Sequence, residues 1–254
     1  FYIDDISILK VSNTPPEPPI VQTRAKIKVF LEGAYDSTNN VMRTLLADGN
    51  LLPTHQPYFT QPWYYTRNDS VATSNDFPSN TVDWLLLELR DANDAFALVD
   101  TAVALLLSDG TVVDPHDFEA GVVFPNASPN TDYYIAVKHR NHLSIISAYT
   151  INLPNDTLYN FSNDPTQVNG SIYQQSLVDT IAPPNNSNVY ALKSGDFNAD
   201  GVITVIDFNN YYLQTSATNV YLFGDCGLNG SVTVGDYNLY QNNASCIGVA
   251  EIRY

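Results

Sequence analysis

Two stretches near the C-terminal end of the sequence carry oxygen-bearing side chains at a spacing that suits Ca²⁺. In the first stretch, a glycine occupies position six of a twelve-residue loop, where the tight turn requires a positive φ. Ca²⁺ takes roughly six to eight oxygen ligands, and a loop of this length can wrap around one ion. The predicted ligands are the side chains of Asp196, Asn198, Asp200, Thr204 and Asp207 and the main-chain carbonyl of Val202.

The same pattern recurs 29 residues later, which indicates an internal duplication. Position three of this second loop is Gly227, which has no side-chain oxygen, so a water molecule would have to replace that ligand. We therefore predict two calcium sites, of which the second is the weaker. An Asn- and Asp-rich turn without an ion is the alternative for either loop. The predicted ligands of the second loop are Asp225, Asn229, Ser231, Thr233 and Asp236.

The two cysteines of the chain flank the second loop and the residues that follow it. Cys226 and Cys246 are 20 residues apart. In an oxidising compartment such a pair can close a disulfide, which would staple the weaker calcium site. Two buried free thiols are the alternative.

Most of the chain that precedes these loops is predicted to form β-strands. Alternating polarity over 27–31 predicts a half-buried strand, and Asp109-Gly110 predicts a hairpin turn. A short helix is expected within 42–52, because Gly49 and Pro53 would end it. Short apolar runs bounded by turn residues predict further strands at 84–89, 102–107, 133–137 and 143–146.

Composition and spacing divide the chain into five predicted segments. Strands with intervening turns favour a β-sandwich for the largest of them. Its neighbours are rich in Pro or in Asn, Ser and Asp, which favours linkers. The segments are a β-strand (1–11), a proline-rich linker (12–24), the β-sandwich (25–152), a connector with strands near Tyr159 and Ile172 (153–190), and a calcium-binding module (191–254) with an exit helix at 208–213.

The duplicated loop without a preceding helix resembles a dockerin, a small module that pairs two such loops and packs their exit helices antiparallel. The resemblance implies calcium ligands at these positions: Asp196, Asn198, Asp200, Thr204 and Asp207 in the first loop, and Asp225, Asn229, Thr233 and Asp236 in the second. Dockerins normally bind a cohesin partner through positions just after each loop. At 208–210 and 237–239 the sequence differs from the recognition pairs of cellulosomal dockerins, which argues against a cellulosomal role.

A second resemblance lies in the β-rich region, at 29–35, 52–58, 82–84, 87–90 and 137–143. These segments resemble an uncharacterised domain that precedes dockerin-like repeats in large secreted proteins of Bacteroidetes. The resemblance covers roughly residues 25–250. It implies a mainly β fold, with a β-sandwich domain and a small α-helical dockerin-like module that holds two EF-hand-like calcium loops. It also implies an extracellular or cell-surface location, and no known reaction.

Charge restricts the partners of the chain. There are 27 acidic and 11 basic residues, for a net charge of −16, which argues against nucleic acid and against an anionic membrane. No apolar run approaches the roughly 20 residues that span a bilayer, so we predict no membrane insertion. The sequence opens on Phe1 without a signal peptide, and we expect a mature or trimmed fragment.

The residues that could catalyse a reaction have simpler interpretations, and we predict that the chain is not an enzyme. His139 and His142 stand in a predicted turn between two strands, which favours hydrogen bonding over a metal or acid–base pair. Core and rim packing is the favoured interpretation of Trp84 and of Trp63-Tyr64-Tyr65. A sugar-stacking platform is the other interpretation, so a carbohydrate-binding accessory region of a secreted hydrolase is the alternative function. Four carboxylates are predicted to lie on a solvated face: Glu88, Asp91, Asp94 and Asp100.

Five tripeptides consist of Asp, then Ser or Thr, then an apolar residue or Thr. This tripeptide is similar to the O-glycan acceptor of Bacteroidetes, although each match alone also fits a turn. Several occupied acceptors are therefore expected in natively produced chain. The acceptor residues would be Ser37, Ser70, Thr101, Thr157 and Thr180.

The predicted strand at 1–11 needs a pairing partner beyond the proline-rich linker, because unpaired backbone groups on an apolar strand are costly. It resembles the last strand of jelly-roll modules, so it could end an upstream domain. Alternatively, it completes the sheet of a neighbouring subunit in trans, which would build a fibril. The leading hypothesis is a non-catalytic, extracellular, calcium-binding structural or adhesive protein. Its partner would be another copy of itself or another surface protein, with glycans as further ligands.

Overall fold

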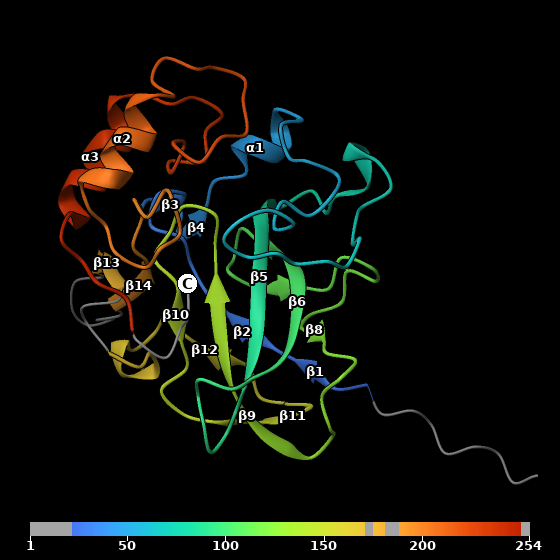
Figure 1. Ribbon diagram of the computed structural model, residues 1–254. Helices are drawn as coiled ribbons and strands as arrows, with labels where there is room; N and C mark the ends of the chain where they lie inside the picture. The colour runs from blue at the N-terminus through green and yellow to red at the C-terminus, as the bar shows by residue number, and fades with distance from the viewer. Residues whose placement is uncertain (1–21, 171–174, 181–187, 250–254) are drawn as a thin grey trace, which may run out of the picture.

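The computed structural model describes residues 22–170, 175–180 and 188–249, and these residues have a mainly β fold, as predicted (Figure 1). The predicted strand at 1–11, most of the predicted linker at 12–24 and the predicted strand near Ile172 lie outside the described residues. Arg24, the last residue of the predicted linker, already belongs to the first strand, so the β domain begins one residue before its predicted start.

The largest sheet is antiparallel and has six strands, in the order β10-β9-β5-β6-β7, with β11 also paired to β9. Three of the predicted apolar runs form its long strands. The hairpin predicted at Asp109-Gly110 joins β6 to β7, and Gly110 has a φ of +87° there. The strands are β5 (Thr81–Asp91), β6 (Leu98–Leu107), β7 (Val112–Val113), β9 (Thr131–Lys138), β10 (Ile145–Ile146) and β11 (Ile151–Leu153).

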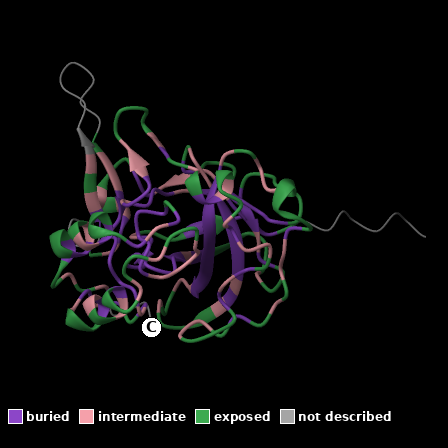
Figure 2. Cartoon of the chain, turned by 90° about the horizontal axis from the view of Figure 1, so that it is seen from above, coloured by how far each residue is buried: buried purple, intermediate pink, exposed green. Residues whose placement is uncertain are grey.

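Hydrophobic residues cover both faces of this sheet, and the central strands lie inside the molecule (Figure 2). On one face Leu85 and Leu87 belong to the same buried cluster as Ile27 and Leu31. On the opposite face Trp84 is buried in a second cluster. Burial on both sides explains why β5 is a continuous apolar run rather than an alternating one.

The layer that faces the large sheet consists of short two-stranded ribbons. The strand predicted over 27–31 is therefore only partly regular, and β2 ends at Lys28. The pairs are β1 (Arg24–Ala25) with β8 (Val122–Val123), β2 (Ile27–Lys28) with β12 (Tyr159–Asn160), β3 (Tyr35–Asp36) with β4 (Val41–Met42), and β13 (Gln175–Thr180) with β14 (Asn188–Leu192).

The predicted connector at 153–190 is partly built into the β domain. Its strand β12 pairs in parallel with β2, and Phe161 and Val168 are buried in the same core as the large sheet. The described part of this segment is therefore not a loose spacer. Leu192, at the end of β14, is also in that core, so the predicted calcium-binding module begins directly on the β domain.

Helices are short and few among the described residues. The helix expected within 42–52 spans only four residues and ends at Asp48, with Gly49 as its C-cap. The first exit helix begins at Val205, three residues before its predicted start, and lies beside the second one (Figure 1). No described helix is long and apolar enough to cross a membrane. The helices are α1 (Leu45–Asp48), α2 (Val205–Tyr212) and α3 (Val234–Asn243), with 3-10 turns η1 (Ser74–Asp76) and η2 (Pro165–Gln167).

Candidate functional site

The two predicted calcium loops follow the same backbone path. Positions four and six have positive φ in both loops: 54° at Ala199 and 84° at Gly201 in the first, 52° at Leu228 and 80° at Gly230 in the second. A left-handed conformation costs energy for residues other than glycine, and it persists where the surrounding structure requires it. The duplication read from the sequence therefore extends to the conformation of the loops.

In the first loop the first and last predicted ligands both turn inward. Asp196 is fully buried, and its two carboxylate oxygens accept hydrogen bonds from the main-chain N–H groups of Asp200 (3.1 Å) and Gly201 (3.1 Å). Asp207 is also buried, and its Oδ1 accepts a hydrogen bond from the Phe197 N–H at 2.8 Å. The loop thus closes around two carboxylates from its opposite ends.

The second loop repeats this arrangement. Asp225 accepts hydrogen bonds from the N–H groups of Asn229 (3.0 Å) and Gly230 (2.7 Å), and Asp236 accepts one from the Gly227 N–H (2.8 Å). A Cβ atom added at Gly227 would lie 3.2 Å from Asp236 Oδ1. Position three of this loop therefore faces the same carboxylate that a bound cation would contact.

Burial makes three of these carboxylates hard to ionise. It raises the pKa of Asp196 to about 8, and the nearby charges of Asp207 and Asp200 add to the effect. Burial likewise raises the pKa of Asp207 and of Asp225. The ion pairs found among the described residues all lie within the β domain. Buried like charges of this kind are stabilised by a cation.

Acidic side chains alone do not complete either loop. Within the described ranges, no group of three or more His, Cys, Asp or Glu side chains could hold a metal ion. In the first loop, Asp200 accepts hydrogen bonds from Asn198 Nδ2 (2.7 Å) and from the Val202 N–H (3.0 Å). The remaining ligands would have to be amide, hydroxyl and main-chain oxygens, which Ca²⁺ accepts. Calcium binding stays a prediction, and the donor chemistry fits it.

The exit helices connect the two loops reciprocally. Tyr211 of α2 donates a hydrogen bond to the Thr233 carbonyl of the second loop at 2.9 Å, and Tyr240 of α3 donates one to the Thr204 carbonyl of the first loop at 2.9 Å. Thr204 and Thr233 also cap the two helices, each in a capping box with the Asp three residues later. Either loop therefore depends on the position of the other.

The β domain holds the start of both loops through the segment 139–143. The Asn141 carbonyl accepts a hydrogen bond from the Gly195 N–H at 3.0 Å, next to position one of the first loop. Its side-chain Nδ2 donates to the carbonyls of Phe223 (2.9 Å) and Asp225 (2.8 Å), and Asp225 is position one of the second loop. One buried asparagine thus fixes the spacing between the two loops.

A buried ion-pair network lies beside this asparagine. Asp83 accepts hydrogen bonds from His139 Nε2 (3.2 Å), Arg140 Nε (3.1 Å) and Tyr221 Oη (2.6 Å), and the Arg140 guanidinium stacks on the Tyr221 ring. Burial is the largest single effect and opposes the ionisation of Asp83, but the charge of Arg140 and the interactions with His139 and Tyr221 together outweigh it and hold the pKa of Asp83 at about 2. Burial lowers the pKa of His139 and of His142, so both rings are neutral.

A second anchor ties the module to Glu32. This carboxylate accepts hydrogen bonds from the N–H (2.9 Å) and the hydroxyl (2.8 Å) of Ser194 and from the Asn243 amide of α3. Close by, a Cβ atom at Gly33 would lie 1.7 Å from the Cys226 carbonyl oxygen, so only glycine allows this approach. The module is therefore packed onto the β domain at both loops.

The predicted disulfide does not form in this structure, and Cys226 and Cys246 are free thiols. Cys226 is buried in the core of the module, where its sulfur faces the Asp236 carbonyl at 3.6 Å. Cys246 is half-buried, and its sulfur accepts a hydrogen bond from Lys193 Nζ at 3.3 Å. The two side chains therefore have different partners, although they flank the same loop.

Two of the carboxylates assigned to a solvated face are buried instead, because both lie on central strands beside basic side chains. Glu88 pairs with Arg90 and, at 3.0 Å, with Lys138, and Asp100 pairs with Arg67. Trp84 is fully buried and Trp63 stacks on Phe223, as the packing interpretation predicted, whereas Tyr64 is 59% exposed.

The predicted glycan acceptors differ in exposure. Ser37 and Thr157 are exposed, whereas Ser70 and Thr101 are half-buried and lie in backbone paired with His55 and Glu88. Thr180 ends β13, and its side chain lies outside the described part. Glycan occupancy stays a prediction.

Comparison with protein-family models finds no match, and neither does comparison with curated proteins. Two solved structures are similar to part of the chain. One is an N-terminal interface mutant of a type II Cohesin-X-Dockerin complex from Acetivibrio cellulolyticus, with 11% identity over 67% of this chain and 85% of that chain, and a TM-score of 0.38. The other is a C-terminal interface mutant of such a complex from the same organism, with 13% identity over 71% and 92%, and a TM-score of 0.35.

Proposed function

We propose that this chain is a non-catalytic, calcium-stabilised structural or adhesive part of an extracellular or cell-surface protein, and that 191–249 is a dockerin-like calcium module. The observation that carries the proposal is the repeated loop geometry around the carboxylate pairs Asp196/Asp207 and Asp225/Asp236. A calcium ion in each loop would neutralise such a pair and join the start of the loop to the first turn of its helix.

The connections of the two loops support a structural role for the ions. Position one of the second loop is bonded to Asn141, and the start of the first loop is bonded to both Asn141 and Glu32. Closing either loop would therefore stabilise the contact between the module and the β domain. A stable joint between two parts of a chain is useful in a protein that carries load or presents a binding surface.

The partners of the buried titratable side chains support the proposal that the chain is not an enzyme. The buried histidines and acids of the β domain are engaged with one another: His139 with Asp83, and Glu88 with Arg90 and Lys138. Side chains that pair with one another in this way are typical of ion-pair networks that stabilise a fold, and they are not available to a substrate.

Calcium titration of the full chain tests the proposal, because the two loops differ in their predicted ligands and should respond oppositely to two substitutions. Replacing Asp200→Ala removes a carboxylate from the first loop, and we expect its calcium affinity to fall about tenfold or more. Gly227→Asp adds a carboxylate next to Asp236, and we expect the affinity of the second loop to rise by about the same factor. Isothermal titration of the calcium-stripped chain measures both changes.

Gly227→Ala is the matched control, because it adds the same Cβ without an oxygen. It should leave the affinity of the second loop unchanged or slightly lower. If the unmodified chain shows no calcium binding at millimolar concentration, or if Gly227→Asp and Gly227→Ala behave alike, the assignment of these loops to calcium is wrong.

For assembly, we propose that the predicted strand at 1–11 pairs in trans with β13 of a neighbouring copy. Among the described strands β13 pairs with β14 alone, so one of its edges faces away from the ladder. It has six residues, whereas the other edge strands have two to five. An added strand would therefore find a ladder of up to six residues at β13.

Sedimentation velocity of the calcium-loaded chain tests this assembly. The full chain should form concentration-dependent oligomers, and deletion of 1–19 should leave a monomer. Leu177→Lys should act in the same way, because a charged side chain on an edge strand blocks pairing and Leu177 is half exposed. A monodisperse monomer for the full chain would rule out strand addition.

A further inference from the structure

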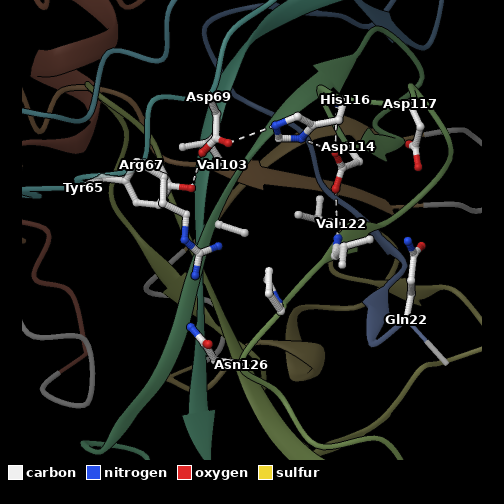
Figure 3. Close-up of a pocket in the computed structure, with 13 residues that line it drawn as sticks. Gln22, Tyr65, Arg67, Asp69, Val103, Asp114, His116, Asp117, Val122 and Asn126 are labelled. Carbon is white, nitrogen blue, oxygen red and sulfur yellow. Dashed lines mark hydrogen bonds and ion pairs between the residues drawn. The ribbon is translucent and has the colours of Figure 1, made fainter. Parts of the chain in front are cut away.

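A pocket of about 490 Å³ lies on the β domain, lined by residues of β6, β8 and the loops around residues 65–69 and 114–117 (Figure 3). It adjoins a second hollow of about 580 Å³, and Tyr65 and Arg67 line both. The Tyr65 and Arg67 side chains thus stand between the two hollows, which together we call the Tyr65 groove. Neither part involves the calcium loops or the segment that holds them.

One wall of the pocket is a chain of fixed hydrogen bonds (Figure 3). Tyr65 donates from its hydroxyl to Asp69, and the other oxygen of Asp69 lies 3.1 Å from His116 Nε2. His116 Nδ1 lies 2.9 Å from Asp114 Oδ1, and Asp114 Oδ2 accepts a hydrogen bond from the Val123 N–H at 3.1 Å. Because Tyr65 and Asp114 are buried, the exposed His116 ring is held from both sides.

The opposite wall is fixed by the buried carboxylate of Asp100. It accepts hydrogen bonds from Arg67 Nη2 (2.5 Å) and from the Asn126 side-chain amide (3.1 Å) and main-chain N–H (3.0 Å). Figure 3 shows the Arg67 and Asn126 side chains beside the central space of the pocket. Two planar polar groups with further hydrogen-bonding capacity are thus held in place before any ligand arrives.

Apolar side chains line the pocket between the polar walls. The combination of an apolar surface with fixed planar donors and acceptors matches a pyranose ring, which has one C–H face and a rim of hydroxyl groups. The size also fits, because ligand pockets usually hold roughly 300–1,000 Å³. The apolar lining residues are Ala102, Val103, Val122, Val123 and Pro125.

The charge of the pocket selects against acidic ligands. Three carboxylates line it, from Asp69, Asp114 and Asp117, against the two basic side chains Arg67 and His116. The Arg67 charge is already paired with Asp100 and the Asp117 charge with Arg24, which leaves the two carboxylates of Asp69 and Asp114 around the single His116 ring. A uronic acid, a sialic acid or a phosphate would therefore meet net negative charge, whereas a neutral sugar would not.

The second hollow extends the surface that a ligand could cover. Its lining includes His55, Gln56 and Asn68, and Phe59, whose side chain is 64% exposed. An exposed aromatic ring beside amide groups is a suitable surface for a further sugar unit. We propose that the Tyr65 groove binds a neutral oligosaccharide, with one unit in the pocket of His116 and Asn126 and a following unit against Phe59. This goes beyond the proposed calcium-dependent role and does not rest on it.

The test uses the full calcium-loaded chain and a panel of neutral hexasaccharides: cellohexaose, xylohexaose, mannohexaose, laminarihexaose and chitohexaose. Amide chemical-shift changes in ¹⁵N-labelled protein measure binding and locate it. At least one of the five should shift the amides of Val103, His116 and Val122 with a Kd in the micromolar to low millimolar range. His116→Ala and Phe59→Ala should each weaken that binding about tenfold or more.

Tyr212→Ala is the matched control for Phe59→Ala, because Tyr212 is an equally exposed aromatic side chain on α2 of the calcium module, 65% against 64%. It should leave sugar binding unchanged, and the melting temperature of each variant shows that it is folded. The proposal fails if none of the five sugars shifts these amides at 10 mM, a concentration roughly at the weak end of specific binding. It also fails if binding survives both groove variants, or if a hexauronate binds more tightly than every neutral sugar. Calcium affinity is measured separately, so failure here leaves the calcium proposal intact.

Discussion

Chelation of calcium should lower the melting temperature of the full chain by roughly 10–20 °C. Two sites that are each saturated about a hundredfold over their Kd contribute about 5 kcal/mol together, and each kcal/mol shifts the melting temperature of a chain this size by about 2–4 °C. The physical reason is the pair of buried carboxylates in each loop, led by Asp196, whose pKa burial raises to about 8. Without a cation these groups repel one another or must take up protons.

Calorimetry of the chain in EDTA, and again after calcium is returned, measures this shift. Magnesium at the same concentration is the control, because it prefers a smaller and stricter octahedral shell and should restore little of the lost stability. Asp94→Ala serves as a variant control, since Asp94 is an exposed carboxylate outside the loops. A melting temperature that EDTA does not change would contradict a structural role for calcium in the unmodified chain.

The repeated conformation of the two predicted calcium loops could be predicted from the sequence because the information for it is local. Each loop carries its candidate ligands, its position-six glycine and its helix cap within twelve residues, and the second loop repeats the first. The long strands β5, β6 and β9 were predictable for a similar reason, since an apolar run between turn residues specifies a buried strand. The left-handed conformation at position four of each loop could not be predicted. Ala199 and Leu228 adopt a positive φ there, and neither is the glycine that usually indicates one.

The contact between the module and the β domain carries no comparable local signal. Glu32 and its partner Asn243 are 211 residues apart, and Asp83 and Tyr221 are 138 residues apart. Each looks like an ordinary polar residue until the fold brings the pair together. The same limit explains why Glu88 was wrongly assigned to solvent: its partner Lys138 stands on β9, which pairs with β5 only in the folded sheet.

Within the contact between the module and the β domain, substitution of the Asp83–Arg140 pair should cause the largest loss of stability. Arg140→Ala leaves the Asp83 carboxylate buried without its cation and removes the donor to the Leu222 carbonyl, so we expect a loss of about 3–5 kcal/mol in the free energy of unfolding. Urea unfolding with calcium present measures it. Tyr221→Phe removes one hydrogen bond to the same carboxylate and should cost only about 1 kcal/mol.

The double variant Asp83→Leu with Arg140→Met distinguishes the cost of an unpaired buried charge from the loss of the ion pair itself. Because it removes both charges and keeps apolar volume, it should recover much of the stability lost in Arg140→Ala. The pH dependence of the unmodified chain gives an independent check. Asp83 has a folded-state pKa of about 2, below its unfolded value, so its stabilisation is complete above the unfolded pKa and is lost as the pH falls through about 2. An Arg140→Ala variant that loses less than about 1 kcal/mol would show that this network does not hold the module in place.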